Sequence, residues 1–344
     1  MSKRHFSMQE YWNRLAEENP PSLRFQGSTL AEWKVWHEQA LRQLQALLGK
    51  LPQRVPLQAQ VEYSAEEKDF TRQRVVFDVD AYLSIPCQVL IPKGMKPDGS
   101  NPAILCSHGH GSFGKDPVAG LVSTSAHQAD IDLMNYDYAA QMARAGFLTL
   151  TPDLRGFGER RDGADPFPGR DACNVNYLKG SLMGYYPLAL NIWDMCRCVD
   201  YLQSRPEVDP QRIGMMGLSQ GGTMTTFTAA LEPRIKAADI IGYVNPFAAF
   251  GIDRANFCGS QILPNLYQYL DAPDVAGLIA PRPLLIEMGT ADSCFFFQDL
   301  WQGYEHVRRI YGAADAADAL VADVHAGAHA FAGNLAFSFF RKHL

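Results

Sequence analysis

A serine between glycines is the residue whose surroundings point most directly to chemistry. The motif GLSQG at 217–221 follows an apolar run and precedes a stretch with helical pattern. A strand-to-helix turn this tight needs neighbours without side chains, and Gly217 and Gly221 supply them. The turn would lift the Ser219 hydroxyl clear of the strands, while the helix points free amides at developing negative charge. We therefore predict that Ser219 is a nucleophile, against the alternative of a Gly/Ser turn without chemistry.

A serine nucleophile needs a base, and the base needs an acid that orients it. After such a turn, the expected chain order is serine, acid, histidine. The segment PLLIEMGTAD at 283–292 reads as a buried strand that runs into a short loop, and Asp292 lies just past its end. Glu287 competes for this role but falls inside the strand. We predict Asp292 as the acid, and the alternative is a cap for a helix that begins near Phe295.

Two histidines compete for the role of the base. The last apolar run, 320–324, is followed by HAGAHAF at 325–331. His329 lies further along this loop, so its ring can reach back over Ser219. His325 is closer to the strand, and we expect it to support the loop by hydrogen bonding. We predict His329 as the base, oriented by Asp292.

The elements that must position these residues follow an alternating pattern. Short apolar runs typical of buried parallel strands occupy 103–106, 146–151, 212–217, 237–241, 283–288 and 320–324. Helical patterns occupy 138–145, 188–204, 221–231, 300–311 and 334–343. This alternation predicts an α/β fold with a mostly parallel central sheet flanked by helices. The runs 74–79 and 84–92 suit an antiparallel pair at a sheet edge, where Pro86 is tolerated.

The chain divides into two parts by pattern. The helical pattern of residues 1–56 predicts an N-terminal extension, and the alternating pattern of residues 57–344 predicts the catalytic domain. Within that domain, 156–186 and 242–278 are longer than a simple crossover and read as cap-like insertions. Both emerge where strands end, which is where ligands bind in sheets of this type.

Five motifs together resemble the α/β-hydrolase superfamily, in its branch of dienelactone-hydrolase-like and acetyl-xylan-esterase-like serine esterases. They are HGHG at 108–111, PDLRGFGER at 152–160, RIGMMGLSQGG at 212–222, APRPLLIEMGTAD at 280–292 and HAGAHAF at 325–331. The resemblance covers about residues 70–344. It implies Ser219, Asp292 and His329 as a triad, and no cofactor. Dienelactone hydrolase proper uses a cysteine nucleophile, so Ser219 argues against that activity.

The glycine-rich loop HGHG is the expected partner of the nucleophile. In α/β-hydrolases one oxyanion amide comes from this loop and the other from the residue after the serine. We therefore expect the backbone N–H groups of His110 and Gln220 to form the oxyanion hole. Phe157, in the loop after the next strand, is expected to line the substrate pocket.

Histidines and cysteines give no sequence signal for a metal. His108 and His110 lie two apart, with no carboxylate or third histidine at recognised ligand spacing nearby, so we expect no metal and a His108 that braces its own loop. The seven cysteines are scattered, without paired CxxC units, which indicates reduced thiols.

Composition narrows the class of protein. Apolar residues make up 47% and charged residues 20% of the 344 residues, values ordinary for a globular enzyme. A net charge of −6 argues against nucleic-acid binding. We expect no membrane span and no secretory signal, and hence a cytoplasmic protein. A homo-oligomer is left open.

The predicted reaction is hydrolysis of a small-molecule carboxylic ester by a serine carboxylesterase. Small acyl groups, acetyl among them, follow from the resemblance alone. One alternative is a serine peptidase of the prolyl-oligopeptidase type, although 344 residues leave no room for the propeller domain of those enzymes. The other is a non-catalytic binding protein that kept the fold.

Overall fold

The apolar runs of the sequence become the strands of one twisted sheet. A computed structural model of the chain describes residues 4, 6–111, 113–162 and 169–344. Within these residues the sheet has nine strands in the order β1-β2-β3-β5-β4-β6-β7-β8-β9. The strands are β1 (Gln60–Glu66), β2 (Phe70–Asp78), β3 (Ser84–Pro92), β4 (Asn101–Ser107), β5 (Leu148–Pro152), β6 (Val208–Leu218), β7 (Ile235–Ile241), β8 (Leu284–Gly289) and β9 (Leu320–His325). Strands β5 to β9 with β4 are parallel, which confirms the predicted fold class.

One detail of the expected sheet is wrong. β2 and β3 are antiparallel as expected, but the edge strand is β1, and β3 lies between β2 and β5. The carbonyl of Pro86 accepts the amide of Asp153 at 3.1 Å, so the backbone of Pro86 faces β5 just where that strand ends. The N–H and C=O of one strand residue point to the same side. The nitrogen of Pro86, which carries no hydrogen, therefore faces the end of β5, where the sheet loses no hydrogen bond.

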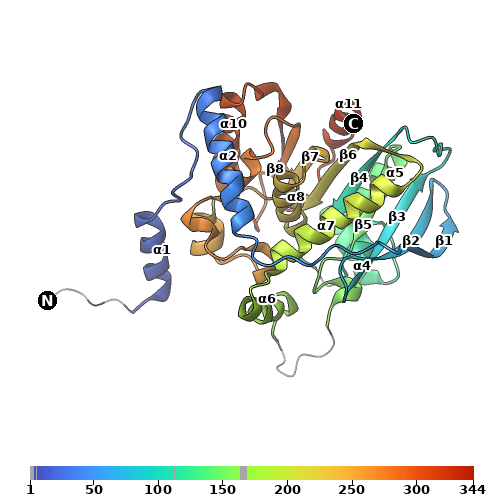
Figure 1. Cartoon of the computed structure of the whole chain (residues 1–344), viewed down its shortest axis with the longest axis horizontal. Coiled ribbons are helices and arrows are strands. Elements are labelled where there is room, and N and C mark those ends of the chain that lie inside the picture. The colour runs from blue at the N-terminus through green and yellow to red at the C-terminus, as the bar shows by residue number, and fades with distance from the viewer. Residues whose placement is uncertain (1–3, 5, 112, 163–168) are drawn as a thin grey trace.

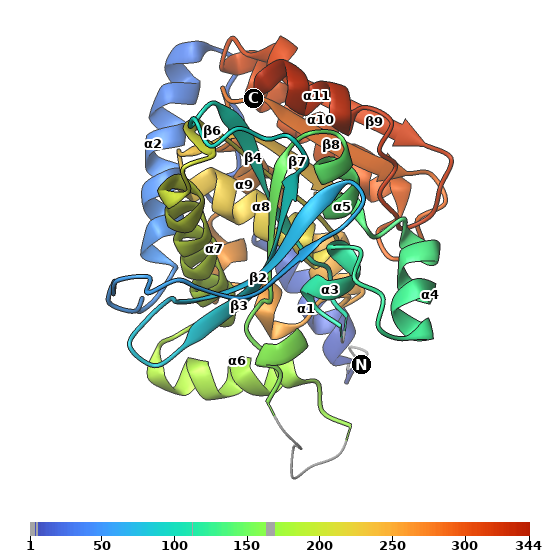
Figure 2. The same ribbon diagram turned by 90° about the vertical axis from the view of Figure 1, so that its right-hand side faces the viewer.

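Helices cover both faces of the sheet (Figures 1 and 2). One face packs against α2 (Leu30–Ala46), α7 (Pro187–Ser204), α8 (Gln220–Leu231), α9 (Ala272–Gly277) and α10 (Phe297–Ala313). The other packs against α5 (Tyr138–Arg144) and α11 (Ala336–His343), near α3 (Lys115–Val118) and α4 (Ser125–Met134). Neighbouring strand residues alternate between the two cores, with Ala103 and Leu105 in one and Ile104 and Cys106 in the other. Strands buried on both faces read as continuous apolar runs for this reason.

The N-terminal stretch forms two helices that differ in how they pack. Thr29 and Glu32 form a capping box at the start of α2, which buries Trp36 and Leu44 in the core shared with α7 and α8. The first helix, α1 (Met8–Glu18), lies at the outside of the molecule (Figure 1), next to the π-helical turn η2 (Ala248–Asp253). The division into an extension over 1–56 and a domain over 57–344 stays a prediction, and residues 1–3 and 5 lie outside the described residues.

The two predicted insertions hold short elements near the carboxyl ends of the strands. Residues 156–186 contain the 3₁₀ turn η1 (Gly158–Arg160) and α6 (Ala172–Met183), while residues 163–168 lie outside the described part. Residues 242–278 contain η2, the 3₁₀ turns η3 (Gly259–Gln261) and η4 (Leu266–Gln268), and α9. Among the described residues, no helix has both the length and the apolar character that a membrane crossing requires.

Three acidic side chains are buried on the α11 face of the sheet. Glu287 in β8 lies opposite Asp323 in β9, and Asp239 lies on the neighbouring strand β7. One oxygen of Glu287 accepts the amide of Ala332 at 2.8 Å, so this carboxyl group holds the loop that follows His329. Burial, reinforced by the charge of Asp323, raises the pKa of Glu287 to about 8.

The raised pKa of Glu287 predicts a stability that falls as the pH rises. The folded chain keeps a proton that the unfolded chain loses near its ordinary pKa of 4.5, so the free energy of unfolding decreases between about pH 4.5 and 8. Glu287→Gln removes this titration, so we expect a smaller decrease in the free energy of unfolding between pH 5.5 and 8. Denaturant unfolding at the two pH values measures it. Glu38→Gln, at an exposed site on α2, should keep the wild-type slope. An unchanged slope in Glu287→Gln would contradict the assignment.

Candidate active site

Ser219 occupies a strained turn between β6 and α8. Its backbone has φ 63° and ψ −117°, a conformation that residues with side chains rarely adopt. Two hydrogen bonds hold it there, from the Ser219 amide to the Ile241 carbonyl and from the Thr223 amide to the Ser219 carbonyl, both 2.9 Å long. Strain held in this way is typical of functional turns.

The two glycines of the motif are required by close backbone approach. A Cβ on Gly221 would overlap the carbonyl oxygen of Ser107 at the end of β4. A Cβ on Gly217 would come 2.6 Å from the backbone of Gly221. The start of α8 can therefore reach the sheet only because both side chains are absent.

The structure brings Asp292 and His329 together. Oδ2 of Asp292 and Nδ1 of His329 are 2.7 Å apart, and the Asp292 side chain is almost fully buried. The other oxygen, Oδ1, accepts the amides of Cys294 and Phe295 at 2.7 and 2.8 Å. Asp292 does not cap a helix, because α10 begins at Phe297 without a side-chain cap. One oxygen of Asp292 instead fixes the turn after β8 while the other holds the imidazole. A carboxylate that accepts from Nδ1 leaves Nε2 of His329 as the basic nitrogen.

The ring of His329 is held in place by its neighbours near the turn that carries Ser219. It stacks on Phe295 with ring centroids 5.3 Å apart. A Cβ on Gly242, the residue after β7, would lie 3.0 Å from His329 Cε1, so the ring covers the end of the strand next to Ser219. Among the described residues, the buried Nε2 atom has no hydrogen-bond partner. Catalytic hydrogen bonds are often long before substrate binds, so transfer of the serine proton to this nitrogen stays a prediction.

The competing residues have structural contacts instead. Glu287 is buried within β8 and binds the amide of Ala332. His325 Nδ1 accepts the amide of Gly327 at 3.1 Å, which is the loop-supporting role expected of it. Burial also lowers the pKa of His325, so its ring is suited to accept this bond as neutral imidazole.

His110 and Gln220 flank the serine from two directions. Gln220 is the first residue of α8, and His110 lies in the loop after β4. The neighbouring Gly109 touches the elbow, since a Cβ there would lie 3.4 Å from the Cβ of Ser219. This places the HGHG loop against the nucleophile. The roles of the two amides as an oxyanion hole stay a prediction.

Buried polar side chains hold the HGHG loop in place. His108 Nε2 accepts the amide of Leu154 at 3.0 Å, and its Nδ1 faces the carbonyl of Gly109 at 2.7 Å, so His108 braces its loop. Burial lowers the pKa of His108 and keeps the ring neutral, as both contacts require. Tyr136 accepts the amide of Gly109, and the hydroxyl of Tyr138 donates to Ser107. No local pattern marks the two tyrosines, which lie at the entry to α5.

Phe157 and His110 bring the loops after β5 and β4 together. The Phe157 side chain is buried, with its ring edge against His110 at a centroid distance of 5.2 Å. A contact of Phe157 with substrate stays a prediction. Close to the same histidine lie Cys173 and Cys258, which sequence reasoning missed because they come from segments 85 residues apart.

A groove of about 1320 Å³ lies on another side of α6. Its lining includes Tyr82 from the β2–β3 turn, Arg155 and Glu159 from the loop after β5, and Lys179 from α6. Ser219, Asp292 and His329 are not among the lining residues. The groove therefore lies apart from the predicted catalytic residues.

The fold and the order of these residues define a class of protein. A parallel sheet with a serine elbow after β6, an acid after β8 and a histidine after β9 is the arrangement of the α/β-hydrolase fold. The chain belongs to the Abhydrolase family, whose family model matches residues 1–325.

Known proteins agree with this classification. YtaP of Bacillus subtilis (strain 168), named as a hydrolase, is 29% identical over 281 residues, or 80% of this chain and 88% of YtaP. A Bacteroides fragilis NCTC 9343 protein described as an acetyl xylan esterase superposes with a TM-score of 0.75 at 16% identity, covering 94% of this chain and 83% of that one. A glucuronoyl esterase from Solibacter usitatus gives 0.64 at 14% identity, covering 95% and 99%. At these identities, the two structures show a shared fold.

Asp292→Asn tests the proposed orientation of the imidazole. The amide would donate to Nδ1 of His329 and force the proton onto Nε2, so that this nitrogen could no longer accept the serine proton. We expect kcat for an ester substrate to fall by about 10⁴-fold, with a small change in KM. Steady-state hydrolysis of an activated ester measures this. Asp299→Asn, on α10, is the matched control. Near-wild-type turnover by Asp292→Asn would mean that another residue is the acid.

Proposed function

We propose that the chain is a serine carboxylesterase that hydrolyses carboxylic esters of small acyl groups through Ser219, His329 and Asp292. The observation that carries this proposal is the 2.7 Å hydrogen bond between Asp292 and His329, which leaves Nε2 without a partner among the described residues. The ring of His329 lies against Gly242, and the preceding residue, Ile241, accepts the amide of Ser219 on its strained strand-to-helix turn. The esterase names of the structural neighbours support the same class of reaction.

The first half of the reaction forms an acyl-enzyme. Oγ of Ser219 attacks the ester carbonyl carbon while Nε2 of His329 takes the hydroxyl proton. The carbonyl oxygen gains negative charge, which the amides of His110 and Gln220 would stabilise. Loss of one such donor typically costs about 3 kcal/mol of transition-state stabilisation. The carbon–oxygen bond to the alcohol then breaks, and His329 gives its proton to the leaving oxygen.

The second half repeats these steps with water. His329 removes a proton from a water molecule that attacks the acyl carbon, and the bond to Ser219 Oγ breaks as the proton is returned to it. Asp292 stays ionised and stabilises the imidazolium formed in each half. The net products are a carboxylic acid and an alcohol, so the cycle needs no redox partner.

Packing beside His329 supports a small acyl group. The ring of Phe295 stacks on His329 on one side and on Phe250 on the other, with a Phe250–Phe295 centroid distance of 4.4 Å. Both phenylalanines are buried. These rings fill the space behind the base, and closely packed aromatic rings yield little to a long alkyl chain.

Ser219→Ala tests the nucleophile. We expect ester turnover to fall by roughly 10⁶-fold, because no other group can accept the acyl chain in the same geometry. A fluorophosphonate probe should label the wild-type chain at Ser219, as peptide mass spectrometry would show, and should leave the variant unlabelled.

Ser338→Ala on the exposed side of α11 serves as the control and should match the wild type in both assays. Substantial hydrolysis by Ser219→Ala, or labelling of a different serine, would overturn the proposal. A wild-type chain that neither reacts with the probe nor turns over esters would support the non-catalytic alternative.

A series of nitrophenyl esters from acetate to decanoate tests the acyl preference. We expect kcat/KM to be highest for acetate and to fall with chain length, because Phe250 and Phe295 close the space beside His329. Faster turnover of decanoate than of acetate would refute the small-acyl assignment. Nitroanilide peptides assayed beside the esters separate esterase from peptidase activity.

A further inference from the structure

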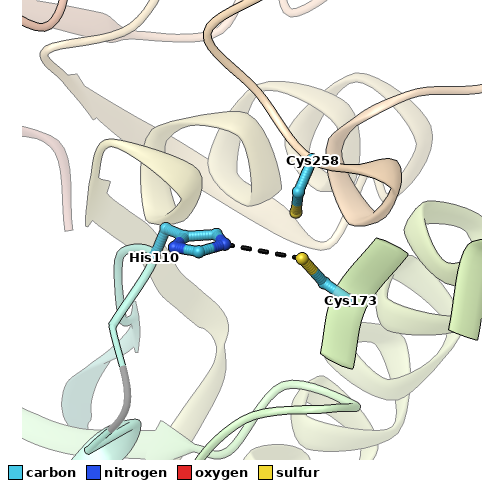
Figure 3. Close-up of side chains that lie close together, drawn as sticks. All are labelled: His110, Cys173 and Cys258. Atoms are coloured by element: carbon cyan, nitrogen blue, oxygen red, sulfur yellow. Dashed lines mark hydrogen bonds between the residues drawn. The ribbon is translucent and has the colours of Figure 1, made fainter. Parts of the chain in front are cut away.

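Three side chains of types that can bind metals, one histidine and two cysteines, lie close together beside the HGHG loop. His110 comes from the loop after β4, Cys173 from the first turn of α6, and Cys258 from the residue before η3 (Figure 3). Their ligand atoms, Nε2 and two Sγ atoms, all lie within 4.8 Å of one another. Both cysteines are buried, while His110 is partly exposed. In Figure 3 the imidazole and the two thiols point at one common space.

The spacing of these atoms fits a tetrahedral ion. Zinc binds cysteine sulfur at about 2.3 Å and histidine nitrogen at about 2.0–2.1 Å, so neighbouring ligand atoms of a tetrahedron lie about 3.3–3.8 Å apart. Nε2 of His110 and Sγ of Cys173 are 3.5 Å apart. This separation is within the range for two ligands of one zinc ion.

Asp171 lies next to this group of three side chains. Its Oδ2 atom lies 3.3 Å from Nε2 of His110. It directly precedes α6, two residues before Cys173. One short segment at the start of α6 thus brings a carboxylate and a thiol to the same imidazole nitrogen.

The surroundings hold the two cysteines in position. Oγ of Ser260 lies 2.8 Å from Sγ of Cys258 and accepts the side-chain amide of Gln220 at 2.8 Å. With that acceptor occupied, the serine hydroxyl can donate to the sulfur, as partners of metal-bound thiolates do. The amide of Gly259 donates to Asn174 at 2.7 Å, which ties η3 to α6 between the two cysteines.

We propose that His110, Cys173 and Cys258 bind one zinc ion that joins α6 and η3 to the loop carrying the predicted oxyanion amide. Thiolate sulfur and imidazole nitrogen select zinc over magnesium or calcium, which prefer oxygen ligands. These three side chains leave the fourth position of the tetrahedron to water or to a reoriented Asp171. In the proposed reaction, Ser219 and His329 transfer the acyl group, and the ion holds the three segments together. Both thiols lose their protons to solvent when zinc binds. This proposal departs from the expectation, drawn from sequence, that the chain binds no metal.

Zinc binding to the reduced, full-length chain tests the proposal. After dialysis against zinc, we expect one bound ion per chain by elemental mass spectrometry. Cobalt in its place should give a thiolate-to-cobalt charge-transfer absorption. Cys173→Ser and Cys258→Ser should each weaken zinc binding by more than about 100-fold, whereas Ser260→Ala should weaken it by about 10–100-fold as an outer partner.

Cys196→Ser is the matched control, since Cys196 lies on α7 away from the group, and it should keep one zinc. Circular dichroism shows whether each variant folds, and zinc binding is read without any esterase assay, so it stands apart from the proposed function. Zinc retained by both cysteine variants would overturn the proposal. Zinc lost in Cys294→Ser would place the ion at Asp292 and His329 instead, which also overturns it. A reduced chain that binds no zinc but forms a Cys173–Cys258 disulfide on oxidation would do the same.

Discussion

The start of α8 lies so close to the end of β4 that no side chain fits between them. Gly221 rests against the carbonyl of Ser107, and β4 and β6 are adjacent strands that pair Ser107 with Gly217. The HGHG loop and the Ser219 elbow therefore leave the sheet side by side. Any Cβ at Gly221 would push the helix outward and separate the serine from the loop that is expected to face its oxyanion. The geometry of the other active-site residues depends on this contact.

The order of strands then fixes where the remaining groups lie. β7, β8 and β9 follow β6 in the sheet and run parallel to it, so their carboxyl ends reach the same edge. Asp292 and His329 follow β8 and β9, and Gly242 at the end of β7 leaves room for the imidazole to cross towards Ser219. This is why sequence reasoning could bring Asp292 and His329 together. Each lies a few residues past an apolar run, and parallel strands convert that position into proximity.

Contacts that depend on tertiary packing could not be predicted from the sequence. The antiparallel edge was misplaced, because the exposed strand β1 alternates apolar and polar residues and lacks the continuous apolar run that marks a buried strand. The support of the HGHG loop by Tyr136 also has no local signal. Nor does the meeting of His110 with Cys173 and Cys258, since each of these residues lies in a different loop or helix start. Spacing along the chain predicts ligands only when one segment supplies several of them.

Buried charges do much of the positioning around the site. Asp153, fully buried after β5, binds both the backbone amide and the ammonium group of Lys115 at 2.8 and 3.0 Å, and also accepts the amide of Glu159. It thereby joins the segment after the HGHG loop to the turn that carries Phe157. Removing one partner of such a buried pair leaves an uncompensated charge, which indicates a structural role for Asp153.

The segments that bring the cysteines to His110 are the least regular parts of the fold. Residues 156–186 and 242–278 contain short turns and a π-helical segment, and such stretches gain less from hydrogen bonding than continuous helices do. Ordering them over the site costs conformational entropy that a few apolar contacts offset only in part. A metal ion that links three segments far apart in sequence would offset this cost, because its binding free energy adds to the stability of the folded chain. The sheet, α6 and η3 already bring the ligands together. The side chain of Gln220 donates to the hydroxyl of Ser260, which in turn contacts Cys258. The same link would therefore hold the backbone of His110 at a fixed distance from Gln220. The proposed zinc site and the proposed oxyanion hole thus share His110 through different atoms, the imidazole for the metal and the amide for the substrate.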